Sequence, residues 1–535
     1  MKNISDKKVI YDNAIEKLES GDYPAGIYGL YQVIDGGSES NVELDLAEAY
    51  FDIGSIQDAQ KFYIRVLDKN TRDEDAYLGM INCFIEMGEQ ELANYYFIKG
   101  IKEKVLDKEK LDDYFTQEVQ VEPPIKIYDS KDKQRMVDIA SKLLVSGDED
   151  YAEQILKSLA NPDIKQYTEV CALLALLYIK QKRFDEVSKF ADKILQSDDN
   201  DVFGYVYKII ACYNMGFDNE LKEYIDKLLS LDTNDEQYLA KVAACMMTIG
   251  DSQNAKEYLQ RQLALQPFAK ATLIGLSLSC AAQGEFSLAK RHIVTAHRLF
   301  PEDVEIKYYA HLIREQDSDA AKRIMQNGLD SGKWLKELEN FMVEHSSLSK
   351  IESALKKNPD MRQKLTWLEQ CPPCKQQMDI LSFFAQSDKW REQSQRLLLL
   401  PDFDLHTKKL ILKNMLITSS KKDFSLYTCG ILRKYRPKKL QRTPLADAYY
   451  TAYTTMAFVD SKFDKKLFDA YKVVEKSEIS DIDKIETAAA VMFYLAGGVN
   501  VIKSKKDCAE IFGVKEEDFM KFVYKSGLDK DYEFK

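Results

Sequence analysis

Apolar residues recur along the first 300 positions at the three- and four-residue spacing of amphipathic helices, and glycine interrupts them at a fixed interval. Around Gly284, small or apolar residues stand seven and four positions before it and five, nine and twelve after it, namely Ser277, Cys280, Ala289, Ile293 and Ala296. The frame recurs 34 positions earlier around Gly250, then around Gly216, and then with Lys182 in the glycine position. Such a fixed period indicates a stacked helical repeat.

Copies of the same frame lie nearer the start of the chain, around Gly54, Gly88 and Gly147, with a weaker first copy at Gly21. Gly88 and Gly147 are 59 positions apart, which exceeds the period, and the stretch between them contains Pro123, Pro124 and many charges. We therefore expect three copies in residues 1–120, an exposed linker at 121–132, and about five copies plus a degenerate pair in 133–330.

Each frame position has a physical reason. Glycine ends a first helix cheaply because it adopts a left-handed conformation without strain, small residues let two helices cross closely, and Pro267 and Pro301 end second helices. This pattern resembles the tetratricopeptide repeat, although the family's early Trp is absent. The resemblance implies an all-α fold, a right-handed α-α superhelix. Another helical-hairpin repeat of similar length is the alternative.

The resemblance also implies that first helices line a concave groove that binds a peptide or helix of a partner protein. The groove positions change from acidic to apolar along the chain: Asp45, Glu48, Asp52, Leu173, Leu176, Ile179, Tyr207, Ile210, Tyr213, Met247, Ile274 and Leu278. Positions at which some family members clamp a terminal carboxylate hold Tyr11, Ile15, Asp45, Asp75 and Gly79 here, so that mode is not expected. Burial of the apolar face by the chain's own helices is the competing interpretation.

Beyond residue 330 the period fades. Residues 331–420 predict irregular helical hairpins, and 421–535 a C-terminal helical domain. Alternating apolar residues on both sides of Gly430 predict one small β-hairpin, which is basic. A solvated face, or docking to an acidic partner, to nucleic acid or to the acidic front repeats, would explain that charge.

The last 50 or so residues weakly resemble a helix-turn-helix of the cyclin-type repeat, through Ala509, Gly513, Val514, Phe519 and Phe522. A DNA-reading helix begins with Arg, Lys, Asn or Gln, whereas this one begins with Lys515, Glu516, Glu517 and Asp518. A packing module is therefore favoured, and a regulator that couples partner sensing to nucleic-acid binding is the alternative function.

The net charge of −12 is unevenly distributed, with 14 basic and 27 acidic residues in 1–130 but 25 basic and 20 acidic in 401–535. An acidic front disfavours nonspecific nucleic-acid binding there. We expect a cytoplasmic protein, because the N-terminus lacks a signal-peptide pattern, no apolar run is long enough for a membrane span, and the nine cysteines are scattered.

Candidate chemistry is sparse. Cys371 and Cys374 have a C-x-x-C spacing, which suits a structural turn, half a zinc site or a redox pair. The turn is favoured because the sequence shows neither the further ligands that a zinc site needs nor the surrounding sheet that a redox motif needs. No nucleotide-binding, metalloprotease or serine-hydrolase motif occurs. The sequence therefore predicts a noncatalytic scaffold without a cofactor.

Overall fold

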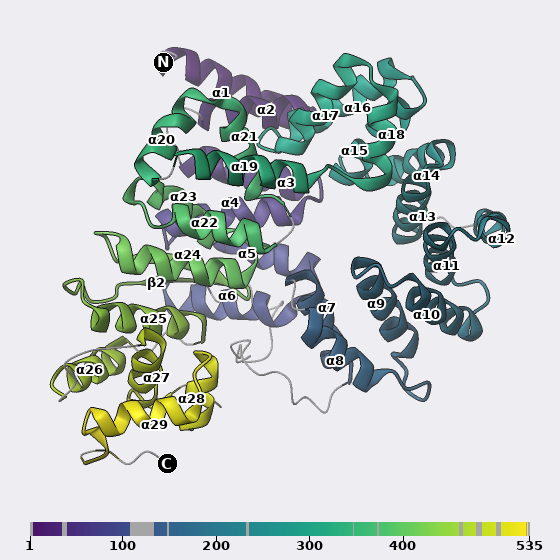
Figure 1. Cartoon of the computed structure of the whole chain (residues 1–535). Helices are drawn as coiled ribbons and strands as arrows, with labels where there is room; N and C mark the ends of the chain where they lie inside the picture. The colour runs from purple at the N-terminus through teal and green to yellow at the C-terminus, as the bar shows by residue number, and fades with distance from the viewer. Residues whose placement is uncertain are drawn as a thin grey trace. The chain divides into compact units, whose positions relative to one another are not determined.

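The computed structural model describes residues 4–34, 40–107, 133–146, 149–231, 235–345, 347–371, 374–459, 464–477, 484–498, 504–530 and 532. Within them lie 29 α-helices and one two-stranded sheet (Figure 1), so the predicted all-α class and the predicted hairpin are confirmed. The predicted linker at 121–132 lies outside the described residues. The chain divides into two compact units, the first comprising residues 1–55, 128–341 and 355–371, and the second 56–127, 342–354 and 372–535.

The first unit contains the longer run of repeats. Its helices are α1 (Ile4–Glu19), α2 (Tyr23–Ile34), α3 (Ser40–Asp52), α7 (Lys133–Ser146), α8 (Glu149–Leu159), α9 (Tyr167–Lys180), α10 (Phe184–Ser197), α11 (Val202–Met215), α12 (Asp218–Ser230), α13 (Glu236–Ile249), α14 (Ser252–Leu265), α15 (Lys270–Ala282), α16 (Phe286–Leu299), α17 (Val304–Glu315), α18 (Ser318–Asn327) and α21 (Pro359–Leu368). Helices α19 (Ser331–His345) and α20 (Leu348–Lys357) each span a division between the units.

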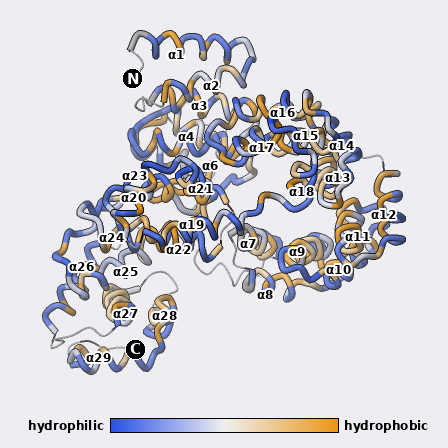
Figure 2. Tube along the Cα trace, turned by 45° about the horizontal axis from the view of Figure 1, so that its top comes forward, coloured by the Kyte–Doolittle hydropathy of each residue, from blue (hydrophilic) through white to orange (hydrophobic). Residues whose placement is uncertain are grey.

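Helices α9 to α16 pack as successive antiparallel pairs, each against the next (Figure 1). Their apolar faces join into one continuous core from Val137 to Leu276. Figure 2 shows hydrophobic residues along α9, which the core buries on one side. The glycines that end first helices have left-handed backbones, with φ of +74° at Gly216, +83° at Gly250 and +76° at Gly284. The 34-residue frame therefore marks the turns of the repeat.

Lys182 occupies the glycine position of its copy and has φ +56°. A residue with a side chain in this left-handed region costs about 1–2 kcal/mol of stability. Glycine removes that cost, but its greater flexibility in the unfolded chain offsets part of the gain. We expect Lys182→Gly to stabilise the first unit by about 0.5–1 kcal/mol in urea unfolding. Gln181→Gly, at a residue with φ −81°, is the control and should be destabilising. Equal effects of the two substitutions would contradict this assignment.

The first hairpin stacks on the end of the repeat array within this unit. Helix α2 packs on α16, and Tyr50 of α3 donates a hydrogen bond of 2.6 Å to the Leu299 carbonyl. The Tyr50 ring stacks on Phe300 at 5.9 Å, and Tyr23 meets Phe268 edge to face at 5.6 Å. The order of the repeats in space thus differs from their order in the sequence.

The second unit joins the third repeat pair to the C-terminal region. It contains α4 (Ile56–Lys69), α5 (Glu74–Glu86), α6 (Gln90–Lys102), α22 (Lys375–Phe384), α23 (Arg391–Leu399), α24 (Leu405–Thr418), β1 (Phe424–Thr428), β2 (Ile431–Tyr435), α25 (Pro444–Val459), α26 (Asp464–Glu475), α27 (Ile485–Leu495), α28 (Lys505–Ile511) and α29 (Glu516–Lys525), with 3-10 turns at Asp388–Trp390 and Leu528–Lys530.

The β-hairpin is closed by a two-residue turn, Cys429–Gly430, in which both residues have positive φ. Such turns match the twist of the paired strands. A side chain at Gly430 would overlap Leu92 of α6, and the Leu432 amide donates to the Tyr96 hydroxyl of α6 at 3.3 Å. The basic hairpin is therefore docked on the front repeats.

Lys408 of α24 is fully buried beneath the hairpin. Its ammonium group donates to the carbonyl oxygens of Leu400 at 2.5 Å and Tyr427 at 2.7 Å. Burial lowers the pKa of Lys408 to about 7, against a smaller opposing effect of Cys429, Asp402 and Asp404. Strand β1 thus accepts a hydrogen bond from a buried lysine that loses its charge near neutral pH.

Candidate functional site

An apolar helix face on α9 and α11 is the best-formed part of the groove expected from the sequence. Leu173, Leu176 and Ile179 of α9 are half-buried, as is Ile210 of α11, and Tyr213 is 38% exposed. Leu176 and Ile210 occupy the same repeat position, 34 residues apart. Helix spacing of three and four places such side chains on one stripe.

Helix α18 covers the continuation of this face. It packs mainly on α15 and also on α13, and makes few contacts with α17, its neighbour in sequence. Its buried residues are Ala321 and Met325, and the Met325 sulfur accepts a hydrogen bond from the Ser279 hydroxyl of α15 at 3.6 Å. Gln326 of α18 reaches Tyr213 of α11, with its amide donating to the Tyr213 hydroxyl at 3.3 Å.

These contacts show that α18 covers parts of α13 and α15. A methyl group at Gly250, the end of α13, would overlap the Gln326 side chain. Ile274 and Met247 are half-buried and Leu278 is only 3% exposed. Burial by the chain's own helices, the competing interpretation of the sequence, therefore applies to α13 and α15. Among the described helices, none packs across the α9 and α11 face in the way that α18 packs across α13 and α15.

The pair α17–α18 departs from the degenerate ninth repeat that the sequence predicts, because α18 folds across first helices instead of packing beside α17. The signal in the sequence was the spacing: the left-handed residue that ends α17 is Gln316, 32 residues after Gly284 rather than 34.

Tyr207, the remaining apolar groove residue, is 6% exposed and lies in the core, where burial raises the pKa of its hydroxyl to about 12. A partner could contact Tyr207 only after movement of α11.

The acidic groove residues all belong to α3, which packs on α2. Asp45 accepts a hydrogen bond from the Tyr11 hydroxyl at 2.8 Å, and burial raises the pKa of its carboxyl group. Asp52 accepts from the Tyr23 hydroxyl at 3.4 Å, while Glu48 is exposed. The hydrogen bonds of Asp45 and Asp52 therefore link α3 to the first hairpin, whereas the apolar set belongs to α9–α15.

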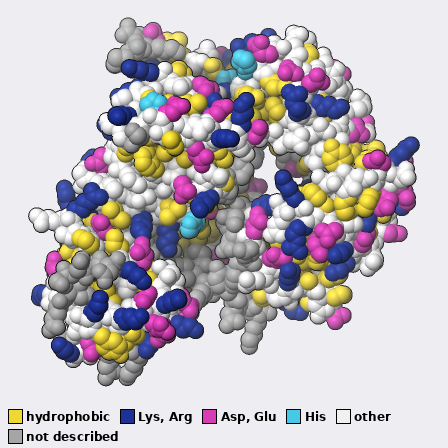
Figure 3. Space-filling view, in the orientation of Figure 1, with side chains coloured by type: hydrophobic (Ala, Val, Ile, Leu, Met, Phe, Trp, Pro, Cys, Tyr) yellow, Lys and Arg dark blue, Asp and Glu magenta, His cyan; other side chains and the backbone are white. Residues whose placement is uncertain are grey.

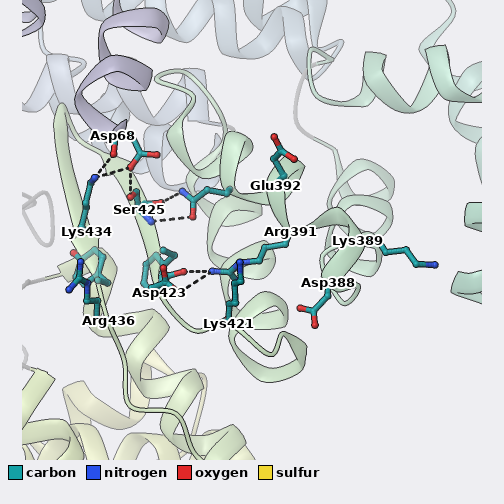
Figure 4. Close-up of a pocket in the computed structure, with 13 residues that line it drawn as sticks. Asp68, Asp388, Lys389, Arg391, Glu392, Lys421, Asp423, Ser425, Lys434 and Arg436 are labelled. Atoms are coloured by element: carbon teal, nitrogen blue, oxygen red, sulfur yellow. Dashed lines mark hydrogen bonds and ion pairs between the residues drawn. The ribbon is translucent and has the colours of Figure 1, made fainter. Parts of the chain in front are cut away.

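A polar cavity of about 580 Å³ opens beside the hairpin in the second unit (Figure 4). Lys434 of β2 contacts Asp68 of α4, and the Asp68 carboxylate also accepts from the Ser425 hydroxyl of β1. Arg391 donates to the carbonyl oxygens of Lys421 and Asp423, and Figure 4 shows it pointing toward Asp423. Intramolecular partners thus hold the best-placed cations of this cavity.

Helices α28 and α29 form the expected helix-turn-helix, with Gly513 at φ +66° and Phe519 buried. The acidic start of α29 is paired inside the unit: Lys484 lies 2.9 Å from Asp518, and Lys505 lies 3.3 Å from Glu516. These ion pairs stabilise packing, and they leave the start of α29 with the carboxylates that duplex phosphates would repel.

Within the described residues, no three His, Cys, Asp or Glu side chains gather as a metal site would require. Cys374 instead caps α22: its sulfur accepts from the Gln377 amide at 3.5 Å, and the Gln377 side chain accepts from the Cys374 amide. Cys371 is buried, and its thiol donates to the Leu368 carbonyl at 3.5 Å. Both thiols thus have structural roles at helix ends.

The charged surface has no large area of one sign on the face drawn in Figure 3, where acidic and basic side chains are intermingled. In the part of the chain that the structure describes, no helix is both long enough and apolar enough to cross a lipid bilayer.

The sequence matches no protein-family model and no curated protein. Among solved structures, the chain is similar to yeast Tom70, with 14% identity and a TM-score of 0.30 over 78% of this chain and 98% of that one. It is similar to Cut9 in the Cut9–Hcn1 hetero-tetramer, with 12% identity and a TM-score of 0.28 over 97% and 96%. It is also similar to the P58(IPK) TPR domain, with 14% identity and a TM-score of 0.19 over 86% and 98%.

These similarities concern the fold alone. The structure itself has paired helices, the 34-residue period and left-handed glycine turns. Its fold is a solenoid of paired α-helices whose turns follow the 34-residue frame, followed by further helices and one β-hairpin.

Proposed function

We propose that this chain is a noncatalytic protein-interaction scaffold that binds an amphipathic helix of a partner protein along α9 and α11. The observation that supports this most directly is α18, an amphipathic helix of the chain itself that lies on the same face one repeat further along. Because successive repeats present equivalent positions, a face that accepts a helix over α13 and α15 suits a second helix over α9 and α11.

The chemistry of the open face supports the same occupant. Leu173, Leu176, Ile179 and Ile210 present aliphatic surface, and Tyr213 adds a ring with a hydroxyl at the end nearest α18. Because the aliphatic residues are already half-buried, covering the rest of each contributes less than the roughly 1.5–3 kcal/mol of full burial. An amphipathic helix matches this stripe because its own apolar residues recur at the same spacing. Nucleic acid has no comparable support, since this face has no row of basic side chains.

We expect the double substitution Leu176→Glu and Tyr213→Glu to weaken partner binding at least about 100-fold, because each carboxylate would replace an apolar contact. Binding should be measured as recovery of each co-purified protein from native cells by quantitative mass spectrometry, and circular dichroism should show unchanged helicity.

The matched control replaces two exposed leucines on second helices, Leu265→Glu with Leu288→Glu, which are 54% and 37% exposed. Partners should be retained by this control and lost by the groove variant. A partner set that both variants retain, or that both lose, would contradict groove binding.

A further inference from the structure

A second cavity, of about 370 Å³, lies between α5, α6 and β2 in the second unit. Lys434, held by Asp68, borders both this cavity and the one in Figure 4. The lining of the smaller cavity is aromatic and cationic: Leu67, Thr71, Tyr77, Tyr95, Tyr96, Lys99, Glu103, Leu432, Arg433 and Lys434.

Two cations, Lys99 and Arg433, line this cavity. Among the described residues, no carboxylate oxygen lies within 4.0 Å of the Lys99 ammonium or the Arg433 guanidinium, and Arg433 lies next to the Tyr95 hydroxyl. The Glu103 carboxylate, the acid of this cavity, accepts the Tyr77 hydroxyl at 3.2 Å. Burial lowers the pKa of Lys99, and the nearby charge of Arg433 lowers it further against the effect of Glu103. Lys99 and Arg433 supply N–H donors of the kind that bind phosphate oxygens, beside the single carboxylate of Glu103.

Tyr95, which is half-buried, is the tyrosine of this cavity that a planar ring can contact, because Tyr77 and Tyr96 are each only 1% exposed and pack behind it. Tyr77 and Tyr96 meet edge to face with ring centroids 6.1 Å apart, and Tyr95 and Tyr96 do so at 5.5 Å. Lys99 lies 5.9 Å from the ring centres of both Tyr77 and Tyr96, which fixes its ammonium group at the aromatic wall. Aromatic side chains bind planar rings by stacked or edge-on contacts, and Arg and Lys bind phosphate oxygens.

We infer that this cavity binds a phosphate monoester that carries a planar ring, with Lys99 and Arg433 on the phosphate and Tyr95 against the ring. A nucleoside monophosphate and a phosphotyrosine side chain share this chemistry. The cavity in Figure 4 is a poorer candidate because Arg391 and Lys434 there are already engaged by carbonyl oxygens and Asp68.

The test is a titration of the full-length chain with adenosine 5′-monophosphate and, separately, with phosphotyrosine amide, followed by ³¹P NMR and calorimetry. Saturable binding of either ligand supports the inference, and the tighter ligand identifies the source of the phosphate. Arg433→Gln and Lys99→Gln should each weaken binding at least ten-fold, with Arg433→Lys intermediate.

Arg436→Gln is the matched control, because it removes the same charge from an exposed residue of the same segment that does not line this cavity. Its affinity should equal that of the unmodified chain. Absence of binding by both ligands, equal binding of adenosine or tyrosine amide without phosphate, or an equal loss in Arg436→Gln would each overturn the inference.

Discussion

Replacing Lys408 by methionine is expected to abolish a rise in the stability of the second unit between pH 7 and pH 9. The folded pKa of Lys408 is about 7, below the ordinary 10.5, so in this window the unfolded chain binds a proton that the folded chain does not. Folding therefore strengthens as pH rises through 7, at up to about 1.4 kcal/mol per pH unit, or about 2 kcal/mol by pH 9.

The measurement is urea unfolding of both proteins at pH 7 and pH 9, with hydrogen exchange of α24 and β1 amides to assign the transition. Methionine should also cost about 1–3 kcal/mol at pH 9, because the Leu400 and Tyr427 carbonyl oxygens lose their donor. Lys421→Met, at an exposed lysine, should retain the pH dependence. If the unfolding free energy of Lys408→Met rose by the same amount between pH 7 and pH 9, groups other than Lys408 would cause the pH dependence.

Met325→Glu is expected to release α18 from the groove. Met325 is 5% exposed against α15, and a carboxylate there would be buried without a counterion, at a cost of several kcal/mol. Isolated helices shorter than about 12 residues are marginal in water, so the ten residues of α18 should unfold once undocked. We expect at least a 100-fold loss of amide protection in residues 318–327, measured by hydrogen exchange.

Lys322→Gln changes the net charge by the same amount at an exposed position of α18 and should leave protection unchanged. The α9–α10 amides should remain protected in both variants, because α18 does not form that pair. Unaltered protection of α18 in Met325→Glu would contradict its docking on α15.

The repeat architecture could be predicted because its determinants are local. The turns after α11, α13 and α15 are marked by glycine, and Lys182 showed that position can override residue type when neighbouring helices impose the turn. The hairpin was predictable for the same reason, since strand alternation and Gly430 are adjacent in sequence.

Long-range packing was not predictable in the same way. The sequence around Tyr50 does not indicate that its hydroxyl will donate a hydrogen bond to the Leu299 carbonyl, 249 residues away. The sequence around Tyr96 likewise does not indicate that its hydroxyl will accept one from the Leu432 amide. The sequence allowed docking of the basic hairpin on the front repeats as one of several options, and the Lys434–Asp68 contact selects it. Tertiary packing of amphipathic faces determines such choices, and periodicity alone does not specify the partner.

Of the residues that the repeat frame assigns to the groove, Leu176 and Ile210 are half-buried and Tyr213 is 38% exposed, whereas Leu278 is buried. The cavity around Lys99 could not be predicted because its residues are far apart in the sequence. Its tyrosines come from both helices of one repeat, whereas Arg433 lies 334 residues after Lys99.

The central claim, a helix-binding face on α9 and α11, is tested most directly by photo-cross-linking from a benzoylphenylalanine residue placed at Leu176 in native cells. The proposal predicts cross-links to one recurrent partner segment whose apolar residues follow a three- and four-residue spacing. The same probe at Leu265 of α14 should not capture that segment. Cross-links from position 176 only to other parts of this chain, or to segments without that spacing, would contradict the claim.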